Sequence, residues 1–187
     1  MEALLSFLKQ VHPLSKEAEN ALLQICSVQI VAKNENLQPI GHTCRNIYFI
    51  KKGLLRIYYL KDGNDITERF EAENAILARA DSLFNASPSR KGIQAIETTT
   101  VIAINSAKLF ALYDQHHDIE RLFRKLFEQA YVQTVNRLES LQFYTAEERY
   151  NNLLKSSAQI IQRAPLKHIA SFLGITQVSL SRIRSKK

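Results

Sequence analysis

The stretch LKHIASFLGITQVSLSRIR, residues 166–184, has the pattern that decides how the end of the chain folds. Its first part predicts a short helix over residues 166–173. Gly174 then supplies the left-handed backbone conformation that commonly ends a helix. Thr176 is suited to cap the start of a second helix over residues 177–184. The stretch therefore predicts two short helices joined by a tight glycine turn.

The side chains of this stretch divide the second helix into a buried face and a free face. Ala170 is small where the two helices must approach each other closely. The predicted shared core consists of Ile169, Leu173, Ile175, Leu180 and Ile183. The positions between them are polar or basic, which is typical of a recognition helix that enters the major groove of DNA. A plain helical hairpin is the alternative, but it would not need alanine, glycine and a basic second helix together.

The second helix of this predicted helix-turn-helix offers side chains for both base edges and phosphates. Gln177, Ser179 and Arg182 are placed to reach base edges, since glutamine suits adenine and arginine suits guanine. The remaining polar and basic side chains are better placed for phosphate groups. They are Thr176, Ser181, Arg184, Lys186 and Lys187.

The distribution of charge also indicates an anionic partner for this end of the chain. The formal net charge of the 187 residues is +7. Residues 145–187 carry eight basic and two acidic side chains, whereas the rest of the chain carries 17 and 16. A nearly neutral body with a basic end is typical of a nucleic-acid-binding protein. A solvated basic tail is the alternative.

Apolar side chains recur at steps of three or four over residues 115–144, which predicts one long helix. The stripe consists of Ile119, Phe123, Leu126, Ala130, Thr134, Leu138 and Leu141. It is about 30 Å long, more than a small barrel can cover, so we expect it to pair with a second copy. The alternative is packing on the chain's own barrel. Thr145-Ala-Glu-Glu148 then forms a capping box that predicts a further helix over residues 146–161.

The first 107 residues change from a short helical pattern to strand chemistry. Strands are expected where β-branched and aromatic residues lie between turn signals, at residues 27–32, 47–50, 54–60, 65–70, 93–96 and 99–104. Lys61-Asp-Gly-Asn64 is a turn of the Asp-Gly kind that favours a tight hairpin. Several short strands at this spacing predict a small antiparallel barrel or jelly roll.

This order of a barrel, a long helix and a helix-turn-helix resembles the Crp/Fnr family of transcription regulators over essentially the whole chain. The segments that carry the resemblance are residues 47–56, 120–128, 137–142, 146–150, 169–176 and 180–184. The chain is most similar to the branch of Bacteroidetes-type bacteria. The resemblance implies an α+β fold with a cyclic-nucleotide-binding-like jelly roll at 1–108, a dimerisation helix at 109–144, and a helix-turn-helix domain without an evident wing at 145–187.

The resemblance implies a regulator that binds a palindromic operator in double-stranded DNA as a homodimer, with RNA polymerase as a further partner. No apolar run is long enough to span a bilayer and no signal peptide is evident, so we expect a cytoplasmic protein without a membrane partner. A small-molecule sensor that acts through a protein partner is the alternative function. We expect no enzyme, because only His42 offers a metal ligand in the strand region and no nucleophile–base pair stands out.

One segment of the predicted barrel, residues 73–92, bears on which ligand the barrel could bind. In cyclic-AMP-binding members of the family, a Gly-Glu pair, a short helix and an Arg-Ser pair hold the nucleotide. Residues 73–92 correspond to this segment and have no Gly-Glu pair. Their charged side chains, Glu73, Arg79, Asp81 and Arg90, are candidates for ligand binding but come in another order. We therefore expect a degenerate cyclic nucleotide site and no cofactor.

Two other cofactors known from the family are also not expected. Cys26 and Cys44 cannot supply the four thiolates of an iron–sulfur cluster. His116 and His117 fit a solvated helix start better than a haem site. We predict no metal site.

Overall fold

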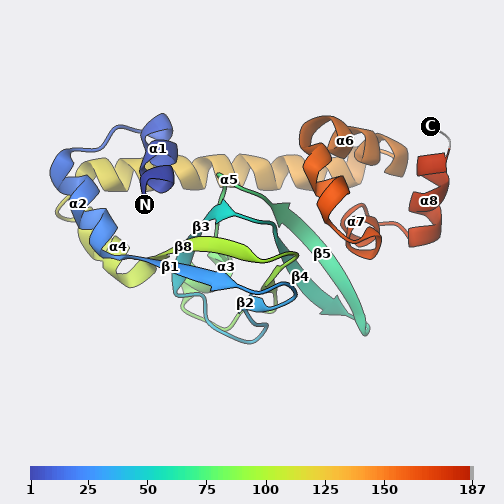
Figure 1. Cartoon of the computed structure of the whole chain (residues 1–187), viewed down its shortest axis with the longest axis horizontal. Coiled ribbons are helices and arrows are strands. Elements are labelled where there is room, and N and C mark those ends of the chain that lie inside the picture. The colour runs from blue at the N-terminus through green and yellow to red at the C-terminus, as the bar shows by residue number, and fades with distance from the viewer. Residues whose placement is uncertain (186–187) are drawn as a thin grey trace.

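The computed structural model describes residues 1–185 of the chain. Helices α1 (Glu2–Val11) and α2 (Lys16–Gln24) come first, a barrel of short strands follows, and helices dominate from residue 106 onward. The long helix α5 (His117–Phe143) runs along one side of the molecule. It connects the end that holds α1, α2 and α4 (Ser106–Tyr113) to the end that holds the last three helices (Figure 1).

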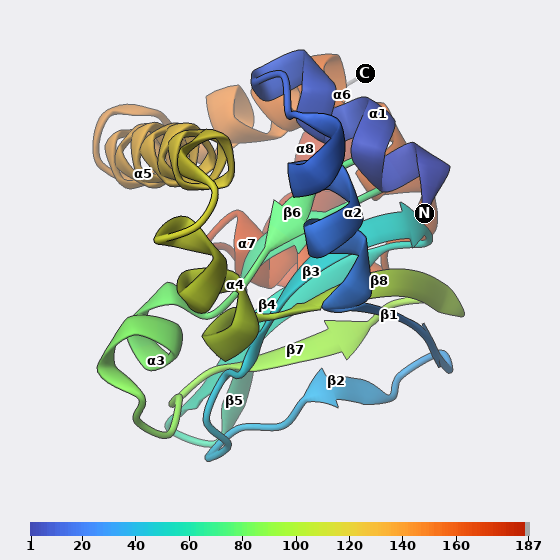
Figure 2. The ribbon, with the colours of Figure 1, turned by 90° about the vertical axis from the view of Figure 1, so that its left-hand side faces the viewer.

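The described residues form two antiparallel sheets of four strands each. One sheet has the order β1-β8-β3-β6, comprising β1 (Cys26–Val31), β8 (Thr99–Asn105), β3 (Asn46–Lys52) and β6 (Ile76–Leu77). The other has the order β2-β7-β4-β5, comprising β2 (Asn36–Gln38), β7 (Gly92–Ala95), β4 (Leu55–Lys61) and β5 (Asn64–Glu71). Seen along α5, the strands β2 and β7 lie on the side far from the helix (Figure 2). The predicted jelly roll and the α+β class are confirmed.

Three local features of the barrel follow directly from residue chemistry. Asp62 and Gly63 both have positive φ, as the tight hairpin between β4 and β5 requires. Gly53 has φ +111°, and a Cβ there would lie 2.7 Å from the Cα of Thr99, so only glycine fits. In β5 the pairing register shifts between Arg69 and Thr67, which makes Glu68 the extra residue of a β-bulge.

The last three helices are α6 (Ala146–Arg163), α7 (Leu166–Phe172) and α8 (Gln177–Ser185). The predicted capping box is confirmed, because Thr145 and Glu148 exchange side-chain and backbone hydrogen bonds at the start of α6. The sequence did not predict that α6 is interrupted at Ser157, which has φ −152° and ψ 50°. It also did not predict α4, the strands β2 and β6, or the short helix α3 (Ala80–Asn85).

The C-terminal helices share one hydrophobic core with the barrel. Its barrel members are Leu54, Phe70, Ala72 and Ile96, and its helical members include Tyr150, Leu153, Ile160, Ile169 and Leu173. The rings of Phe70 and Phe172 meet at 5.4 Å between centroids. The hydroxyl of Ser171 accepts a hydrogen bond of 3.1 Å from the backbone N–H of Thr67. Helix α7 is therefore packed directly on strand β5 (Figure 1).

Candidate DNA-binding helix and sensor cavity

The turn between α7 and α8 has the geometry that the sequence predicted. Gly174 has φ +69°, and the backbone N–H of Ile175 donates to the carbonyl of Ala170 at 3.0 Å. Ala170 is buried, and so are the predicted core residues Ile169, Leu173 and Leu180, while Ile175 and Ile183 are half-buried. The Thr176 hydroxyl caps α8 by accepting from the Ser179 backbone N–H at 3.1 Å.

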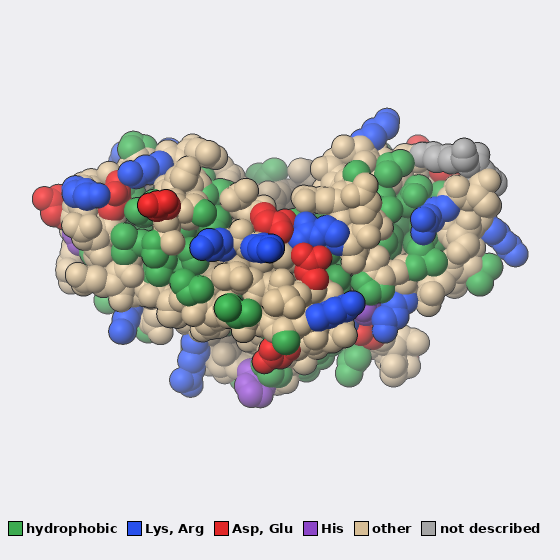
Figure 3. Space-filling model, viewed as in Figure 1, with side chains coloured by type: hydrophobic (Ala, Val, Ile, Leu, Met, Phe, Trp, Pro, Cys, Tyr) green, Lys and Arg blue, Asp and Glu red, His purple; other side chains and the backbone are tan. Residues whose placement is uncertain are grey.

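The outer face of α8 presents most of the predicted DNA-binding side chains to solvent. Thr176, Gln177, Ser181, Arg182 and Arg184 are exposed. Among residues 1–185, no ion pair involves Arg182 or Arg184. Several Lys and Arg side chains project from this end of the molecule (Figure 3). The predicted contacts of Lys186 and Lys187 lie outside the described residues.

Ser179 is less available for a base edge than the sequence suggested. It is half-buried, and its hydroxyl lies 3.0 Å from the hydroxyl of Thr176. Both hydroxyls therefore contribute to the helix cap, whereas Gln177 and Arg182 have no such local role. Val178 is also exposed, although it was not among the predicted contacts.

Two arginines fix the end of α7, a role that was not predicted from the sequence. The guanidinium of Arg149 donates to the carbonyl of Leu173 through Nε at 3.0 Å and Nη2 at 2.8 Å. The guanidinium of Arg137 lies 3.9 Å from the ring centroid of Phe172 and donates to the carbonyl of the same residue. Burial, together with Arg149, lowers the pKa of Arg137 to about 10. Carbonyls at a helix end need such donors, so both arginines hold the turn in place.

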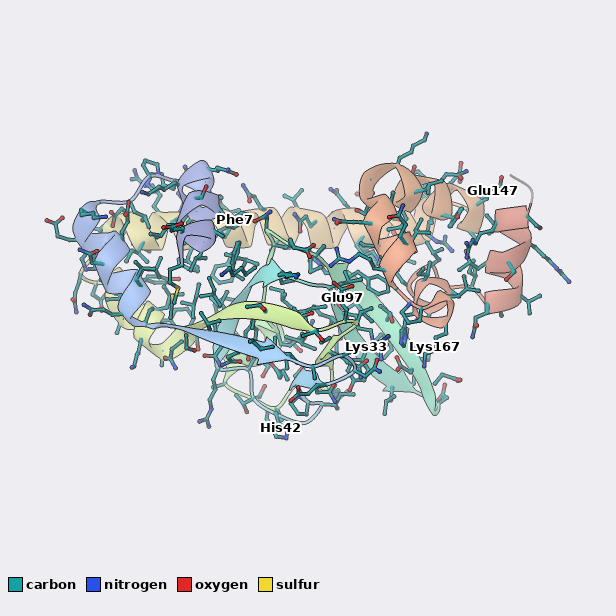
Figure 4. All side chains as sticks on the ribbon, viewed as in Figure 1. Phe7, Lys33, His42, Glu97, Glu147 and Lys167 are labelled. Carbon is teal, nitrogen blue, oxygen red and sulfur yellow. The ribbon has the colours of Figure 1, made fainter. Side chains whose placement is uncertain are left out.

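A third arginine joins α6 to the barrel. The guanidinium of Arg163 donates to both carboxylate oxygens of Glu73, at 2.8 and 2.9 Å. It also donates to both carboxylate oxygens of Glu97, at 2.6 and 3.2 Å. Glu73 also accepts from the backbone N–H of Gly53 at 2.7 Å. The Arg163 hydrogen bonds lower the pKa of Glu73 to about 2. Glu97 lies where the barrel faces the C-terminal helices (Figure 4). We call this group of Arg163, Glu73 and Glu97 the arginine clamp.

The four candidate ligand-binding residues have different partners in the structure. Glu73 belongs to the arginine clamp and so faces the C-terminal helices. Arg79 and Asp81 lie together, with 2.9 Å between Nη2 and Oδ1. Arg90 is exposed and makes no ion pair with a described residue. Among the four candidates, the only side-chain contact between described residues is therefore that of Arg79 with Asp81.

A cavity of about 240 Å³ lies between the barrel and α5. Much of its wall is apolar and includes Ile47, Leu77, Phe123 and Leu126. Its polar wall consists of Arg69, Glu71, Asn74, Gln129 and Gln133, and Arg69 donates to both Glu71 and Gln133. Burial raises the pKa of Glu71, although Arg69 acts against that rise. A mostly apolar cavity with a few convergent polar groups is suited to a small ligand.

The apolar stripe of α5 divides into two halves. Ile119, Phe123 and Leu126 are buried in a core with α1, α2 and β3, so these three predicted seam residues are covered by the chain itself. Ala130, Thr134, Leu138 and Leu141 are exposed. Tyr131, Val132 and Phe143 add exposed apolar surface to this second half. Of the predicted stripe, only the part beyond Leu126 is therefore accessible to a partner helix.

The described residues show no grouping of side chains that could hold a metal ion. Cys26 and Cys44 are free thiols, and burial raises the pKa of Cys26 to about 11. No described helix has the length and apolar character that crossing a membrane requires.

Comparisons with known proteins place these features in context. Residues 28–116 match the family model of the cyclic nucleotide-binding domain. Among solved structures, FixK2 from Bradyrhizobium japonicum is 18% identical, with a TM-score of 0.73 over 87% of this chain and 84% of that chain. A protein assigned to the Crp/Fnr family, from Eubacterium rectale, is 17% identical, with a TM-score of 0.72 over 92% and 83%. The chain has the Crp/Fnr fold.

A further relative of the same fold is the c-di-GMP-responsive global regulator CLP from Xanthomonas campestris. It is 12% identical, with a TM-score of 0.72 over 92% of this chain and 91% of that chain. No curated protein matches the chain by sequence. The Crp/Fnr fold is thus shared over nearly the whole length at low sequence identity.

The cyclic nucleotide that the domain family implies does not fit the residues present. A cyclic phosphate needs convergent donors that are free to bind it. Here Glu73 is bound by Arg163, and Arg79 is already paired with Asp81. Arg90 is exposed and has no ion-pair partner among residues 1–185. We therefore derive no step that uses a bound cyclic nucleotide.

Proposed function

We propose that the chain is a transcription regulator of the Crp/Fnr type that binds double-stranded DNA through α8. The observation that carries this proposal is the exposed outer face of α8. It has two arginines without an ion pair among residues 1–185, and the Thr176 cap holds the start of the helix. A recognition helix of a helix-turn-helix needs this combination of a fixed inner face and a free, basic outer face.

The same geometry supports different roles for the side chains of α8. Gln177 and Arg182 are free to reach base edges, adenine for the amide and guanine for the guanidinium. Thr176, Ser181 and Arg184 are suited to phosphate oxygens. Ser179 remains a candidate for base contact, although its hydroxyl already takes part in the cap. Lys186 and Lys187 are proposed for phosphate contacts from the sequence alone.

A homodimer would have two recognition helices, and it would therefore bind a palindromic operator. The exposed second half of α5 supports this arrangement, because Leu138 is 56% exposed and Tyr131 is 71% exposed. Apolar stripes on long helices are stabilised by pairing with one another. Half-sites would then lie about one helical turn of DNA apart, roughly 34 Å.

Three further proposals come from the family resemblance. They are contact with RNA polymerase, a place in the cytoplasm and membership of the Bacteroidetes-type branch.

The test is a titration of the full chain against a pool of duplex sequences at about 50 and 200 mM salt, with and without cyclic AMP. We expect an affinity that falls steeply with salt. We also expect no response to the nucleotide, because its charged partners are already bound within the chain. Sequences enriched from the pool should be palindromic, and Leu138→Glu should yield monomers by light scattering while leaving the fold intact.

Other results would redirect the proposal. Binding that requires cyclic AMP would contradict the interpretation of residues 73–92. The absence of binding even at low salt would favour the alternative, a small-molecule sensor that acts through a protein partner. Arg182→Ala should relax base preference at one operator position. An equal loss for all sequences would assign Arg182 to phosphate contact instead.

A further inference from the structure

A groove between α3, α4 and α5, where these helices meet (Figure 2), is lined mainly by aromatic side chains. It has a volume of about 470 Å³. We call it the aromatic groove, and its aromatic residues are Phe84, Phe110, Tyr113, Phe127 and Tyr131. Phe84 is 55% exposed and Tyr131 is 71% exposed. Large exposed apolar surfaces of this kind commonly mark a binding site.

The rings of the aromatic groove meet at widely different angles. The ring of Phe84 is nearly parallel to that of Phe110, at 18° and 6.1 Å between centroids. It is closer to perpendicular to the ring of Phe127, at 68° and 5.1 Å. The rings of Phe110 and Tyr113 meet at 57° and 5.6 Å. The groove therefore has ring faces in several orientations, and the negative face of an aromatic ring attracts a cation.

The charged side chains that line the groove include a carboxylate without a close cation. Arg124 is hydrogen-bonded to Glu128, so these two charges largely cancel. Glu120 is the third charged residue of the lining. Its only potential ion-pair partner among residues 1–185 is His117, whose Nδ1 lies 3.8 Å away, too far for a hydrogen bond. The groove thus combines ring faces with a negative charge that is free to attract a ligand.

A buried hydroxyl in the lining of the groove lacks a hydrogen-bond partner. The Oη atom of Tyr113 is buried and has no partner among residues 1–185. Burial, together with the charge of Glu120, raises the pKa of Tyr113, so the hydroxyl keeps its proton. Buried polar groups are almost always hydrogen-bonded. A ligand with a polar end beside its charged group would supply the partner that this hydroxyl lacks.

The aromatic groove is separate from the face of α5 that we expect to pair with a second copy. The residues that α5 contributes to the groove are Glu120, Arg124, Phe127, Glu128 and Tyr131. At 3.6 residues per turn they lie on one side of the helix, about a quarter turn from the apolar stripe that begins at Ile119. The groove is also distinct from the cavity between the barrel and α5, with which it shares only Phe127.

We propose that the aromatic groove binds a small organic cation of the alkylammonium class. Its alkyl groups would contact the rings of Phe84, Phe127 and Tyr131, and Glu120 would balance its charge. Such a cation fits these walls because the ring faces attract the charge while its apolar envelope displaces water. A bare inorganic cation would have to lose a strongly bound hydration shell without gaining oxygen ligands. The proposal does not depend on DNA binding.

The test is a titration of the full chain with choline and, separately, with dimethylbutanol, the neutral analogue in which a carbon atom replaces the nitrogen. The broadening of the ligand's methyl NMR signal follows binding in both cases. Because the two ligands have nearly the same shape, the ratio of their dissociation constants isolates the effect of the charge. We expect choline to bind about five- to tenfold more tightly, as a cation over several rings would give. Equal affinities, or no binding of choline, would overturn the proposal.

Two substitutions of exposed side chains test whether choline binds in the groove. Glu120→Gln should weaken choline binding about threefold and leave dimethylbutanol binding unchanged. Glu139→Gln removes an exposed carboxylate elsewhere on α5 and is the matched control, which should alter neither affinity. Tyr131→Leu keeps a good helix former but removes a ring face, so it should also lower the preference for choline, by about threefold. If neither Glu120→Gln nor Tyr131→Leu lowers that preference, choline binds elsewhere and the proposal is wrong.

A second copy of the chain is the other occupant that the test distinguishes. Leu138→Glu monomers should bind choline as tightly as the natural chain, because Leu138 does not line the groove. Weaker choline binding by these monomers would contradict a site formed by one chain. If Tyr131→Leu instead yields monomers by light scattering and keeps the preference for choline unchanged, the groove is a dimer contact and the proposal is overturned. Failure of the chain to bind DNA, with choline binding intact, would contradict only the proposed function.

Discussion

The arginines of the C-terminal helices form two groups with opposite environments. Arg149 and Arg163 lie on α6 and are engaged by carbonyl or carboxylate oxygens of the chain itself. Arg182 and Arg184 lie on α8 and are exposed. All four contributed equally to the basic end seen in the sequence. The difference shows that the formal charge of a segment overstates the charge available to a partner.

Arg163→Ala should have the largest effect on stability among these arginines. It leaves Glu73 and Glu97 partly buried without their cation and removes the four hydrogen bonds that they accept from it. Since both carboxylates are about one-third exposed, solvent screening reduces the loss to about 2 kcal/mol. Urea unfolding would measure it. A loss comparable to that of an exposed α8 arginine would contradict the distinction between the two groups.

The arginine clamp should also give the protein a specific acid sensitivity. The folded pKa of Glu73 is about 2, below its ordinary value of 4.5, so its contribution to stability is complete above about pH 4.5. It is then lost as the pH falls toward 2. Unfolding free energies between pH 5 and 3 should therefore fall more steeply for the natural chain than for Arg163→Ala. Parallel curves would show that Glu73 does not titrate through the clamp.

Arg149→Ala should have an intermediate effect. It leaves the Leu173 carbonyl without its two guanidinium donors next to the turn. We expect a loss of about 1 kcal/mol in the free energy of unfolding, together with weaker DNA binding because α8 is less firmly positioned. Lys155→Ala, an exposed change on the same helix, is the control and should alter neither. Full stability of Arg149→Ala would mean that water replaces the guanidinium without cost.

Arg182→Ala should have the smallest effect on stability, within about 0.5 kcal/mol, because the side chain is exposed and unpaired within the described residues. Its effect should be on binding, with a loss of about tenfold or more for the preferred operator. A gel-shift titration against that operator and against a scrambled duplex would separate the loss of specific affinity from a loss of affinity for any DNA. Unchanged affinity for both duplexes would move the contact surface elsewhere on α8.

Much of the fold could be predicted because it depends on local patterns. The long helix was expected over residues 115–144 and is found at His117–Phe143, since its apolar repeat continues for many turns. The Asp62-Gly63 hairpin and the Thr145 capping box are likewise decided by a few neighbouring residues. The strands β2 and β6 have only three and two residues, too few for an alternating pattern to be visible.

The candidate sites were less predictable because they depend on contacts distant in sequence. Glu73 and Arg163 are 90 residues apart, and no local pattern shows that they meet. By contrast, the five predicted core residues of the helix-turn-helix lie within 15 residues, and all five belong to one hydrophobic cluster, with Ile175 and Ile183 only partly buried. Its DNA contacts remain a prediction.

The core that α6 and α7 share with the barrel has a consequence for modularity. If the chain were cut after α5, Leu54, Phe70, Ala72 and Ile96 would lose their apolar cover on one fragment, and Tyr150, Leu153 and Ile169 on the other. Neither fragment would then bury all of its apolar side chains. We therefore expect the whole chain to unfold on heating in a single cooperative transition. Exchange of either part with a protein of the same fold would have to carry both sides of this core together, which makes the barrel and the C-terminal helices one folding unit.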